Sequence, residues 1–276
     1  MLPNPPRAAD ETGPAVQTTD LSRRFGALVA VDGVNLSVAE GTIFGLLGSN
    51  GAGKSTLIKM LTTLLPPTSG SARVAGHDIA REPRAVRSRI GYVPQLISAD
   101  GALTGRENLL LSARLYGVPR ADRAQRIAEA LDFMQLTEFA GTLVKNYSGG
   151  MVRRLEIAQA LLHRPAVLFL DEPTVGLDPV ARHAVWVRLR ELRDRGRTTI
   201  LLTTHDMEEA GVLCDELAIL HHGKVRVTGT LDELKAPFGP DATLEQVFVH
   251  HVGETIETAG RLRDVASIRR TTQRLQ

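Results

Sequence analysis

Short apolar segments alternate with helical stretches along most of this chain, and the alternation predicts its fold. Segments with the length and apolar content of β-strands are residues 16–19, 34–38, 42–47, 90–93, 167–170, 198–202, 216–220 and 224–227. Helices are predicted at residues 57–65 and 180–193, where Val185, Leu189 and Leu192 recur on one helix face. Such alternation favours a mostly parallel sheet with helices on both faces and antiparallel pieces at both ends. We therefore expect an α/β fold.

One long segment departs from this alternation. Residues 98–146 contain helix candidates at 107–116 and 122–131 but no convincing strand. We therefore expect an all-helical subdomain inserted into the α/β domain.

The two ends of the chain differ from its middle. Residues 1–14 contain several prolines without a basic start and an apolar stretch, so we expect a disordered leader rather than a signal peptide. The main domain is predicted at residues 15–233. Strand signals stop beyond it, and residues 234–276 are expected to form a small appendage with a short helix.

Composition narrows the classes of function. The 276 residues include 43% hydrophobic and 23% charged side chains, which is enough apolar material for one large buried core. A formal net charge of +2 is too small to indicate a nucleic-acid partner. The single cysteine, Cys214, excludes an internal disulfide and favours a reduced, cytosolic compartment. No apolar run approaches the roughly 20 residues that span a bilayer.

A phosphate-binding loop follows the predicted strand 42–47. The pattern G-x-x-x-x-G-K-[S/T] is matched by Gly48, Ser49, Asn50, Gly51, Ala52, Gly53, Lys54, Ser55 and Thr56. Glycines allow successive backbone N–H groups to converge, and the following helix start adds its positive end, so a polyphosphate can bind. We expect Lys54 to reach the outer phosphates and Ser55 to hold Mg²⁺. The loop predicts nucleotide binding without deciding the reaction.

Two carboxylates end the buried strand 167–170. Asp171 and Glu172 come directly after it, at the edge where α/β sheets place their ligands. Asp171 is the expected acidic partner of the Mg²⁺ bound by Ser55. Glu172, free of the metal, is positioned by this prediction to polarise a water molecule in line with the γ-phosphate.

Two further polar residues follow predicted strands. His205 comes after strand 198–202 and is expected to donate a hydrogen bond to a phosphate oxygen. Gln95 comes after strand 90–93, where its amide is expected to contact Mg²⁺ or the attacking water. Because Gln95 also opens the helical insertion, it is a candidate reporter of phosphate occupancy.

A second helix start suited to anions lies at Ser148, Gly149 and Gly150, before the helical run 151–158. Serine is a preferred cap, and the glycines leave N–H groups exposed at the positive end of the helix. The chain could therefore bind two nucleotides, or bind one nucleotide between two copies. The second possibility fits a symmetric pair.

The order of these motifs resembles the ATP-binding cassette (ABC) ATPases of ABC transporters over residues 16–233. The resemblance implies the ABC ATPase form of the P-loop NTPase fold, with an antiparallel β subdomain, and hydrolysis of Mg²⁺-bound ATP. It places Phe25 where the family stacks an aromatic ring on adenine. It also implies that Ser148, Gly149 and Gly150 close over the γ-phosphate held by the other subunit of an ATP-bound homodimer, and that Asp178 lies in a loop that crosses the dimer.

Finer features resemble the daunorubicin-resistance type of drug-export ATPase. They are Tyr147 and Met151 in place of the common Leu and Gln around the Ser-Gly-Gly centre, Arg153-Arg154-Leu155, Thr203-Thr204-His205, and residues 243–248. The resemblance implies a separately encoded transmembrane permease, a peripheral position on the cytoplasmic side of the membrane, and no direct contact with the exported small molecule. Residues 96–116 are candidate permease contacts.

Three alternatives stay open at this point. The cargo is expected to be a drug or antibiotic-like compound, but similar cassettes export lipids, polysaccharides or oligosaccharides. A soluble ABC ATPase without a transport role is less favoured, because the chain has one cassette and no room for a long coiled coil. A nucleotide sensor that does not hydrolyse ATP is disfavoured because both Glu172 and His205 are present.

Overall fold

The computed structural model describes residues 13–196 and 198–253, and the statements below concern these residues. The leader expected at residues 1–14 lies almost entirely outside them. The same holds for the part of the expected appendage that follows Gly253.

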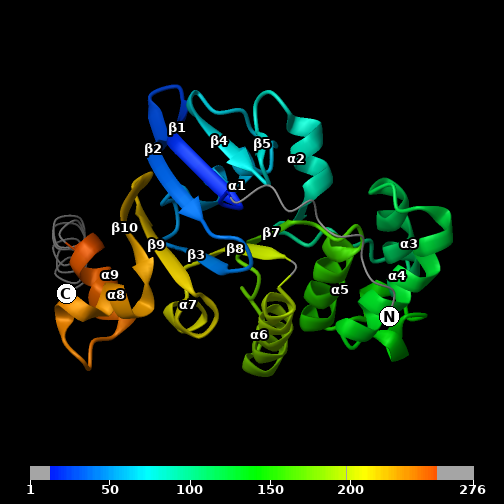
Figure 1. Cartoon of the computed structure of the whole chain (residues 1–276). Coiled ribbons are helices and arrows are strands. Elements are labelled where there is room, and N and C mark those ends of the chain that lie inside the picture. Colours follow the sequence, from blue (N-terminus) through cyan, green and yellow to red (C-terminus); the bar gives the residue numbers. More distant parts are fainter. Residues whose placement is uncertain (1–12, 197, 254–276) are drawn as a thin grey trace, which may run out of the picture.

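A six-stranded sheet forms the centre of the molecule, in the order β10-β9-β3-β8-β7-β6 (Figure 1). Its strands are β3 (Ile43–Leu47), β6 (Ile90–Val93), β7 (Val167–Asp171), β8 (Thr199–Thr204), β9 (Glu216–His221) and β10 (Lys224–Thr230). All neighbouring pairs are parallel except β9 and β10, which form an antiparallel edge. Every residue of β3, β7 and β8 is buried, which explains the consecutive apolar residues at 43–47, 167–170 and 200–202 in the sequence.

A second, antiparallel sheet has the order β2-β1-β4-β5. It comprises β1 (Val16–Phe25), β2 (Leu28–Val38), β4 (Ser69–Val74) and β5 (His77–Asp78). Strands β1 and β2 extend beyond their predicted bounds, and β4 and β5 were not predicted. The reason is visible in β4, where only Ala72 and Val74 are buried and the other side chains are exposed. This sheet lies beside the central one at the end of the molecule where β1 and β2 are labelled (Figure 1).

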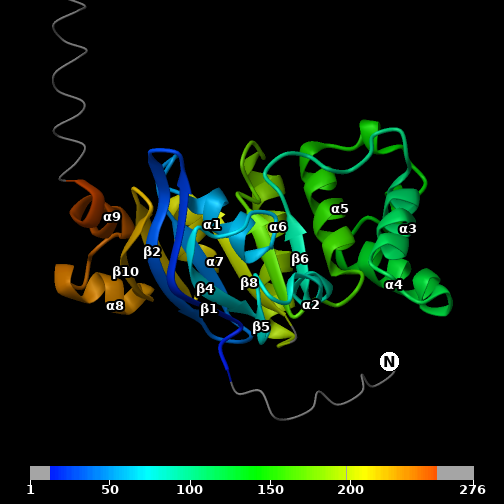
Figure 2. The same ribbon diagram turned by 90° about the horizontal axis from the view of Figure 1, so that it is seen from above.

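Some helices pack on the sheets, and others lie beyond the edges of the sheets (Figures 1 and 2). The helices are α1 (Lys54–Leu61), α2 (Pro83–Arg89), α3 (Gly105–Leu115), α4 (Arg120–Phe133), α5 (Gly149–Leu161), α6 (Pro179–Asp194), α7 (Met207–Leu213), α8 (Leu231–Lys235) and α9 (Leu244–Val252). Successive residues of β3 belong to different cores: Ile43 lies in the core that includes residues of α5, α6 and α7, whereas Phe44 lies in the core that includes residues of α1 and the antiparallel sheet. The central sheet therefore separates two hydrophobic cores, and the predicted α/β fold class is confirmed.

The segment between β6 and α5 contains α3, α4 and two short 3₁₀ turns, with a single isolated β-bridge between Thr104 and Leu143. Helix α3 begins with a capping box, in which Thr104 and Glu107 satisfy each other's backbone N–H groups. This helical part lies at one end of the molecule and joins the sheet through α5 (Figures 1 and 2).

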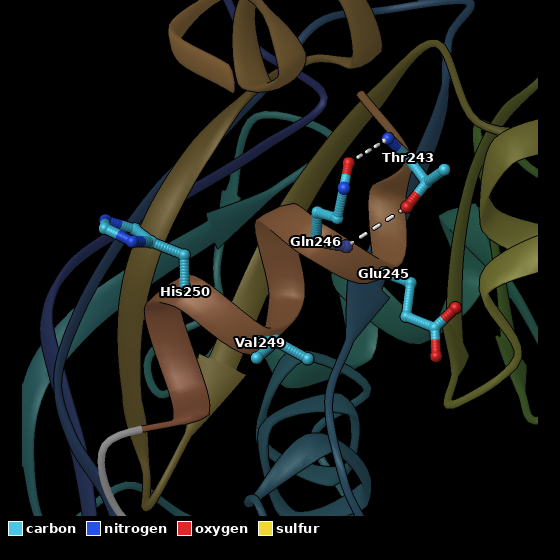
Figure 3. A pocket seen from close by; sticks show the side chains of 5 residues that line it. All are labelled: Thr243, Glu245, Gln246, Val249 and His250. Carbon is cyan, nitrogen blue, oxygen red and sulfur yellow. Dashed lines mark hydrogen bonds between the residues drawn. The ribbon is translucent and has the colours of Figure 1, made fainter. Parts of the chain in front are cut away.

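Helix α9 at the opposite end begins with a second capping box. The Thr243 backbone N–H donates to Gln246 Oε1 at 2.9 Å, and the Gln246 N–H donates to Thr243 Oγ1 at 3.3 Å (Figure 3). Leu244, Val247 and Val252 on this helix belong to the same core as α5 and α6. The described part of the expected appendage therefore packs on the main core. Among the described residues, no helix is both long and apolar enough to cross a membrane.

Candidate nucleotide site

The phosphate loop joins β3 to α1 and closes around its own lysine. Lys54 Nζ donates to the carbonyl oxygens of Gly48 at 2.7 Å and Ser49 at 3.2 Å. A Cβ on Gly48 would lie 2.4 Å from the Leu220 carbonyl oxygen, and Gly53 has a φ of 108°. Both positions therefore need glycine. The loop brings a buried ammonium group to the carboxyl end of the central sheet.

Glu172 is the point where the expected catalytic residues meet. Its Oε1 lies 3.3 Å from Lys54 Nζ and 3.3 Å from His205 Nδ1, and its Oε2 accepts a hydrogen bond from Gln95 Nε2 at 3.3 Å. Gln95 follows β6, Glu172 follows β7 and His205 follows β8, so three adjacent parallel strands deliver the cluster. Gln95 was expected to contact Mg²⁺ or the attacking water, and His205 a phosphate oxygen; in this structure both contact the carboxylate of Glu172.

The backbone of Glu172 is held in an unusual conformation. Its φ is 49°, in the left-handed region that side-chain-bearing residues seldom adopt. The Glu172 N–H donates to Thr203 Oγ1 at 3.0 Å, which anchors the turn to the end of β8. This geometry aims the carboxylate back toward Lys54.

Asp171 lies beside Ser55. Asp171 Oδ1 accepts hydrogen bonds from Ser55 Oγ at 3.1 Å and from Thr203 Oγ1 at 2.7 Å. Burial, followed by the charge of Asp171, raises the pKa of Tyr92 to about 12. The paired hydroxyl and carboxylate oxygens are the hard ligands that Mg²⁺ prefers. Thr203 was quoted in the sequence only as part of the motif with Thr204 and His205, and no contact with Asp171 was predicted for it.

These residues suit a metal that also takes ligands from a bound phosphate. Among residues 13–196 and 198–253, no group of three or more His, Cys, Asp or Glu side chains is arranged to hold a metal by itself. Mg²⁺ usually binds through one or two protein oxygens, with substrate phosphates and waters completing its shell. Ser55 and Asp171 fit that pattern.

The Ser-Gly-Gly segment starts α5 elsewhere on the molecule. Ser148 Oγ accepts a hydrogen bond from the Met151 N–H at 3.3 Å and caps the helix. A Cβ on Gly150 would lie 2.6 Å from the Ala181 Cβ, so this helix start packs against the first turn of α6, which Asp178 caps. Helix α5 packs on β6, three strand spacings from β3, or about 14 Å. Figures 1 and 2 show α5 and α1 at different places along the central sheet.

Phe25 ends β1 and is 44% exposed. The Arg23 guanidinium lies over its ring at 4.6 Å. The ring is therefore available at the surface, and it does not belong to the hydrophobic core.

The comparison with protein families decides the identity. The family model described as ABC transporter matches residues 31–175, a range that contains the phosphate loop, Gln95, Ser148, Asp171 and Glu172. This chain belongs to the ABC transporter family. The ABC fold and the ATPase activity inferred from the sequence are thereby confirmed.

Two curated ABC relatives come from drug-resistance systems. The daunorubicin/doxorubicin resistance ATP-binding protein DrrA of Streptomyces peucetius is 48% identical over 82% of this chain and 68% of its own length. The linearmycin resistance ATP-binding protein LnrL of Bacillus subtilis is 38% identical over 89% of this chain and 78% of its own length.

Solved ABC structures share the fold. The structure of an ATP-binding subunit of an ABC transporter superposes with a TM-score of 0.77 at 34% identity, covering 86% of this chain and 99% of the other. A dimeric post-hydrolysis state of the ATP-binding cassette MJ0796, bound to ADP and Pi, gives a TM-score of 0.70 at 27% identity, covering 78% of this chain and 98% of the other.

Proposed function

We propose that this chain is the ATP-hydrolysing subunit of an exporter whose permease is a separate chain, and that the cargo is a drug or antibiotic-like compound. The observation that carries the enzymatic part is the contact of Lys54, Gln95 and His205 with the single carboxylate of Glu172. The drug-resistance names of the DrrA and LnrL relatives support the choice of cargo. The permease would hold the chain at the cytoplasmic face of the membrane.

Each site residue has a defined task in this proposal. Lys54 binds the outer phosphates, and Ser55 and Asp171 hold Mg²⁺, which neutralises charge on the phosphate oxygens when bound. Glu172 accepts a proton from the attacking water. Gln95 and His205, already in contact with Glu172, orient that water and the γ-phosphate.

The remaining residues act between two copies. The helix start at Ser148, Gly149 and Gly150 presents N–H groups that no phosphate held at the same chain's loop would meet, because α5 packs on β6, three strands away from β3. A second copy can bring its own phosphate loop to this helix start. Asp178, adjacent to it at the start of α6, then faces the partner's site, and Phe25 stacks on adenine.

A phosphate-release assay with two variants tests the enzymatic part. Glu172→Gln is expected to bind ATP as wild type does and to lose about 10² to 10⁴ in kcat, because only the proton acceptor is removed. Lys54→Met is expected to weaken ATP binding itself. Hydrolysis by Glu172→Gln at the wild-type rate would refute the assignment of the base.

Purification of the chain from its native membrane tests the transport role. Mass spectrometry is expected to identify a multi-span membrane protein in the complex. Ribosomal or chromosomal partners instead would favour the soluble, non-transport alternative.

A second cargo class has one observation in its favour. The Nod factor export ATP-binding protein I of Sinorhizobium fredii is 46% identical over 78% of this chain, which spans 62% of that relative. Export of a lipid, polysaccharide or oligosaccharide is therefore the alternative. Transport assays of the reconstituted complex with one drug and one oligosaccharide would separate the two classes.

A further inference from the structure

Helix α5 carries a buried ion pair just after its Ser-Gly-Gly start. Arg153 Nη1 and Glu156 Oε2 lie 3.1 Å apart, one helical turn from each other, and their side chains are 7% and 2% exposed. A charged pair three residues apart on a helix usually lies on the solvated face and contributes little. Removing both charges from water is costly, so this pair needs further partners.

Those partners are the backbone on both sides of Gln95. The Arg153 guanidinium donates through Nη1 to the Pro94 carbonyl at 2.8 Å and through Nη2 to the Gln95 carbonyl at 3.0 Å. Glu156 Oε1 accepts hydrogen bonds from the Ser98 N–H and, at 3.0 Å, from Ser98 Oγ. One ion pair thus holds both ends of the loop 94–98.

The middle of this loop has little other support. Leu96 and Ile97 are 82% and 67% exposed, so their side chains do not anchor it in the core. The side chain of Gln95 nevertheless reaches Glu172 at 3.3 Å. Its position depends on a backbone that Arg153 and Glu156 hold.

We propose that Arg153 and Glu156 are positioning residues for hydrolysis: they fix the backbone of Gln95 so that its amide reaches Glu172. They also fasten the loop to the helix that begins at Ser148, so the loop and that helix start move as one unit. The inference rests on the proposed function only in taking Glu172 as the base.

The test removes both charges at once. In Arg153→Met/Glu156→Leu no unpaired charge is left in the interior, so the fold is expected to survive. We expect kcat for ATP hydrolysis to fall about tenfold or more, since small misplacements of an orienting group are costly. KM for ATP is expected to change little, because Lys54 and Ser55 are untouched. A merely structural role would lower thermal stability without this split between kcat and KM.

A double-mutant cycle with Gln95→Ala shows whether the pair acts through Gln95. If it does, adding Arg153→Met/Glu156→Leu to Gln95→Ala causes no further loss in kcat. Losses that multiply, or a wild-type kcat in the paired variant, overturn the proposal. Should the paired variant fail to fold, Arg153→Lys replaces it in the test, because a lysine ammonium group cannot reproduce the two guanidinium hydrogen bonds to the Pro94 and Gln95 carbonyls.

Arg154 provides the matched control. It is the next residue on α5, but its Nη1 donates to the Met134 carbonyl at 2.9 Å, away from the loop. Arg154→Met is expected to keep kcat near wild type. Failure of the proposed function would appear separately, as an unchanged kcat in Glu172→Gln.

Discussion

Glu209 is a buried carboxylate outside the cluster around Glu172. It accepts hydrogen bonds from Thr174 Oγ1 at 2.6 Å and from Trp186 Nε1 at 3.1 Å. Thr174 lies in the turn between Glu172 and Asp178, so Glu209 on α7 ties that turn to α6. The structure thereby links the residue proposed as the base to the loop proposed to face a partner.

This environment makes stability depend on pH. Burial raises the pKa of Glu209 above its ordinary value of 4.5. The folded state then holds the proton more tightly than the unfolded state, so the stability from this group is present below pH 4.5 and is lost as pH rises through the folded pKa.

Glu209→Gln should remove that loss. Its amide oxygen can accept the same two hydrogen bonds, and it carries no charge at any pH. We expect the variant to gain on the wild type in melting temperature as pH rises from 5 to 8. Scanning calorimetry of both proteins across this range checks it, and a difference that stays constant with pH would contradict it.

At the scale of single residues, the site residues that could be predicted from the sequence are those that follow strands and glycine turns. Lys54, Gln95, Glu172 and His205 could be found because parallel strands end at a common edge. The role of Thr203 could not be predicted, because the position of a threonine next to a strand gives no sign of which neighbours its hydroxyl contacts. Arg153 and Glu156 carried one usable signal, an i, i+3 charge pair directly after the Ser-Gly-Gly centre, but their burial is a property of the packed helix.

At the scale of elements, the close packing of α5 on β6 determines the distance between this helix and the strand that leads to Gln95. A Cβ on Gly91 would lie 2.6 Å from the Ala160 carbonyl oxygen of α5 and 3.0 Å from Leu168 Cδ1. The Ala160 backbone cannot move away from an added Cβ as the end of a flexible side chain can. The glycine therefore determines how near the helix can approach the strand that leads to Gln95.

Gly91→Ala is expected to destabilise the protein by about 1–3 kcal/mol, the usual cost of overpacking. Gly211→Ala on α7 is the matched control, since a Cβ there meets nothing within 4 Å. A helical glycine replaced by alanine should stabilise by roughly 0.5–1 kcal/mol. Urea unfolding of both variants measures the two signs, and equal effects would contradict the packing argument.

Two of the elements that were not predicted from the sequence share one cause. Strand β4 and helix α2 belong to the antiparallel side of the molecule, where each buries few residues: Ala72 and Val74 in β4, and Val86 in α2. A half-exposed element of six or seven residues has too few apolar positions to show a period. The central strands were predicted because both of their faces are buried.

The whole molecule divides its proposed nucleotide contacts between two places. The phosphate loop follows β3, and the Ser148 helix start belongs to the helical end beyond β6 (Figure 2). The order of strands that creates this separation cannot be predicted from apolar periodicity, which finds strands without ranking them across a sheet. A complete site therefore requires two molecules under the proposed function.

Size-exclusion chromatography of Glu172→Gln tests that requirement. With Mg²⁺ and ATP this variant is expected to elute as a dimer, because the ligand that binds the closed pair persists. Adding Ser148→Arg should leave a monomer that still binds ATP. Adding Ser71→Arg, at an exposed position of β4, should leave the dimer intact. A dimer in all three variants would contradict the shared site.

The left-handed backbone of Glu172 lowers the stability of the fold at the residue that the proposed function needs for hydrolysis. A side chain held at a φ of 49° costs on the order of 1 kcal/mol or more, which glycine or asparagine would largely relieve. Laboratory evolution that selects for thermal stability alone should therefore accumulate replacements at position 172, and the resulting proteins should be more stable but unable to hydrolyse ATP. A glutamate kept at this position over many generations is, by the same argument, a record of continuous selection for turnover.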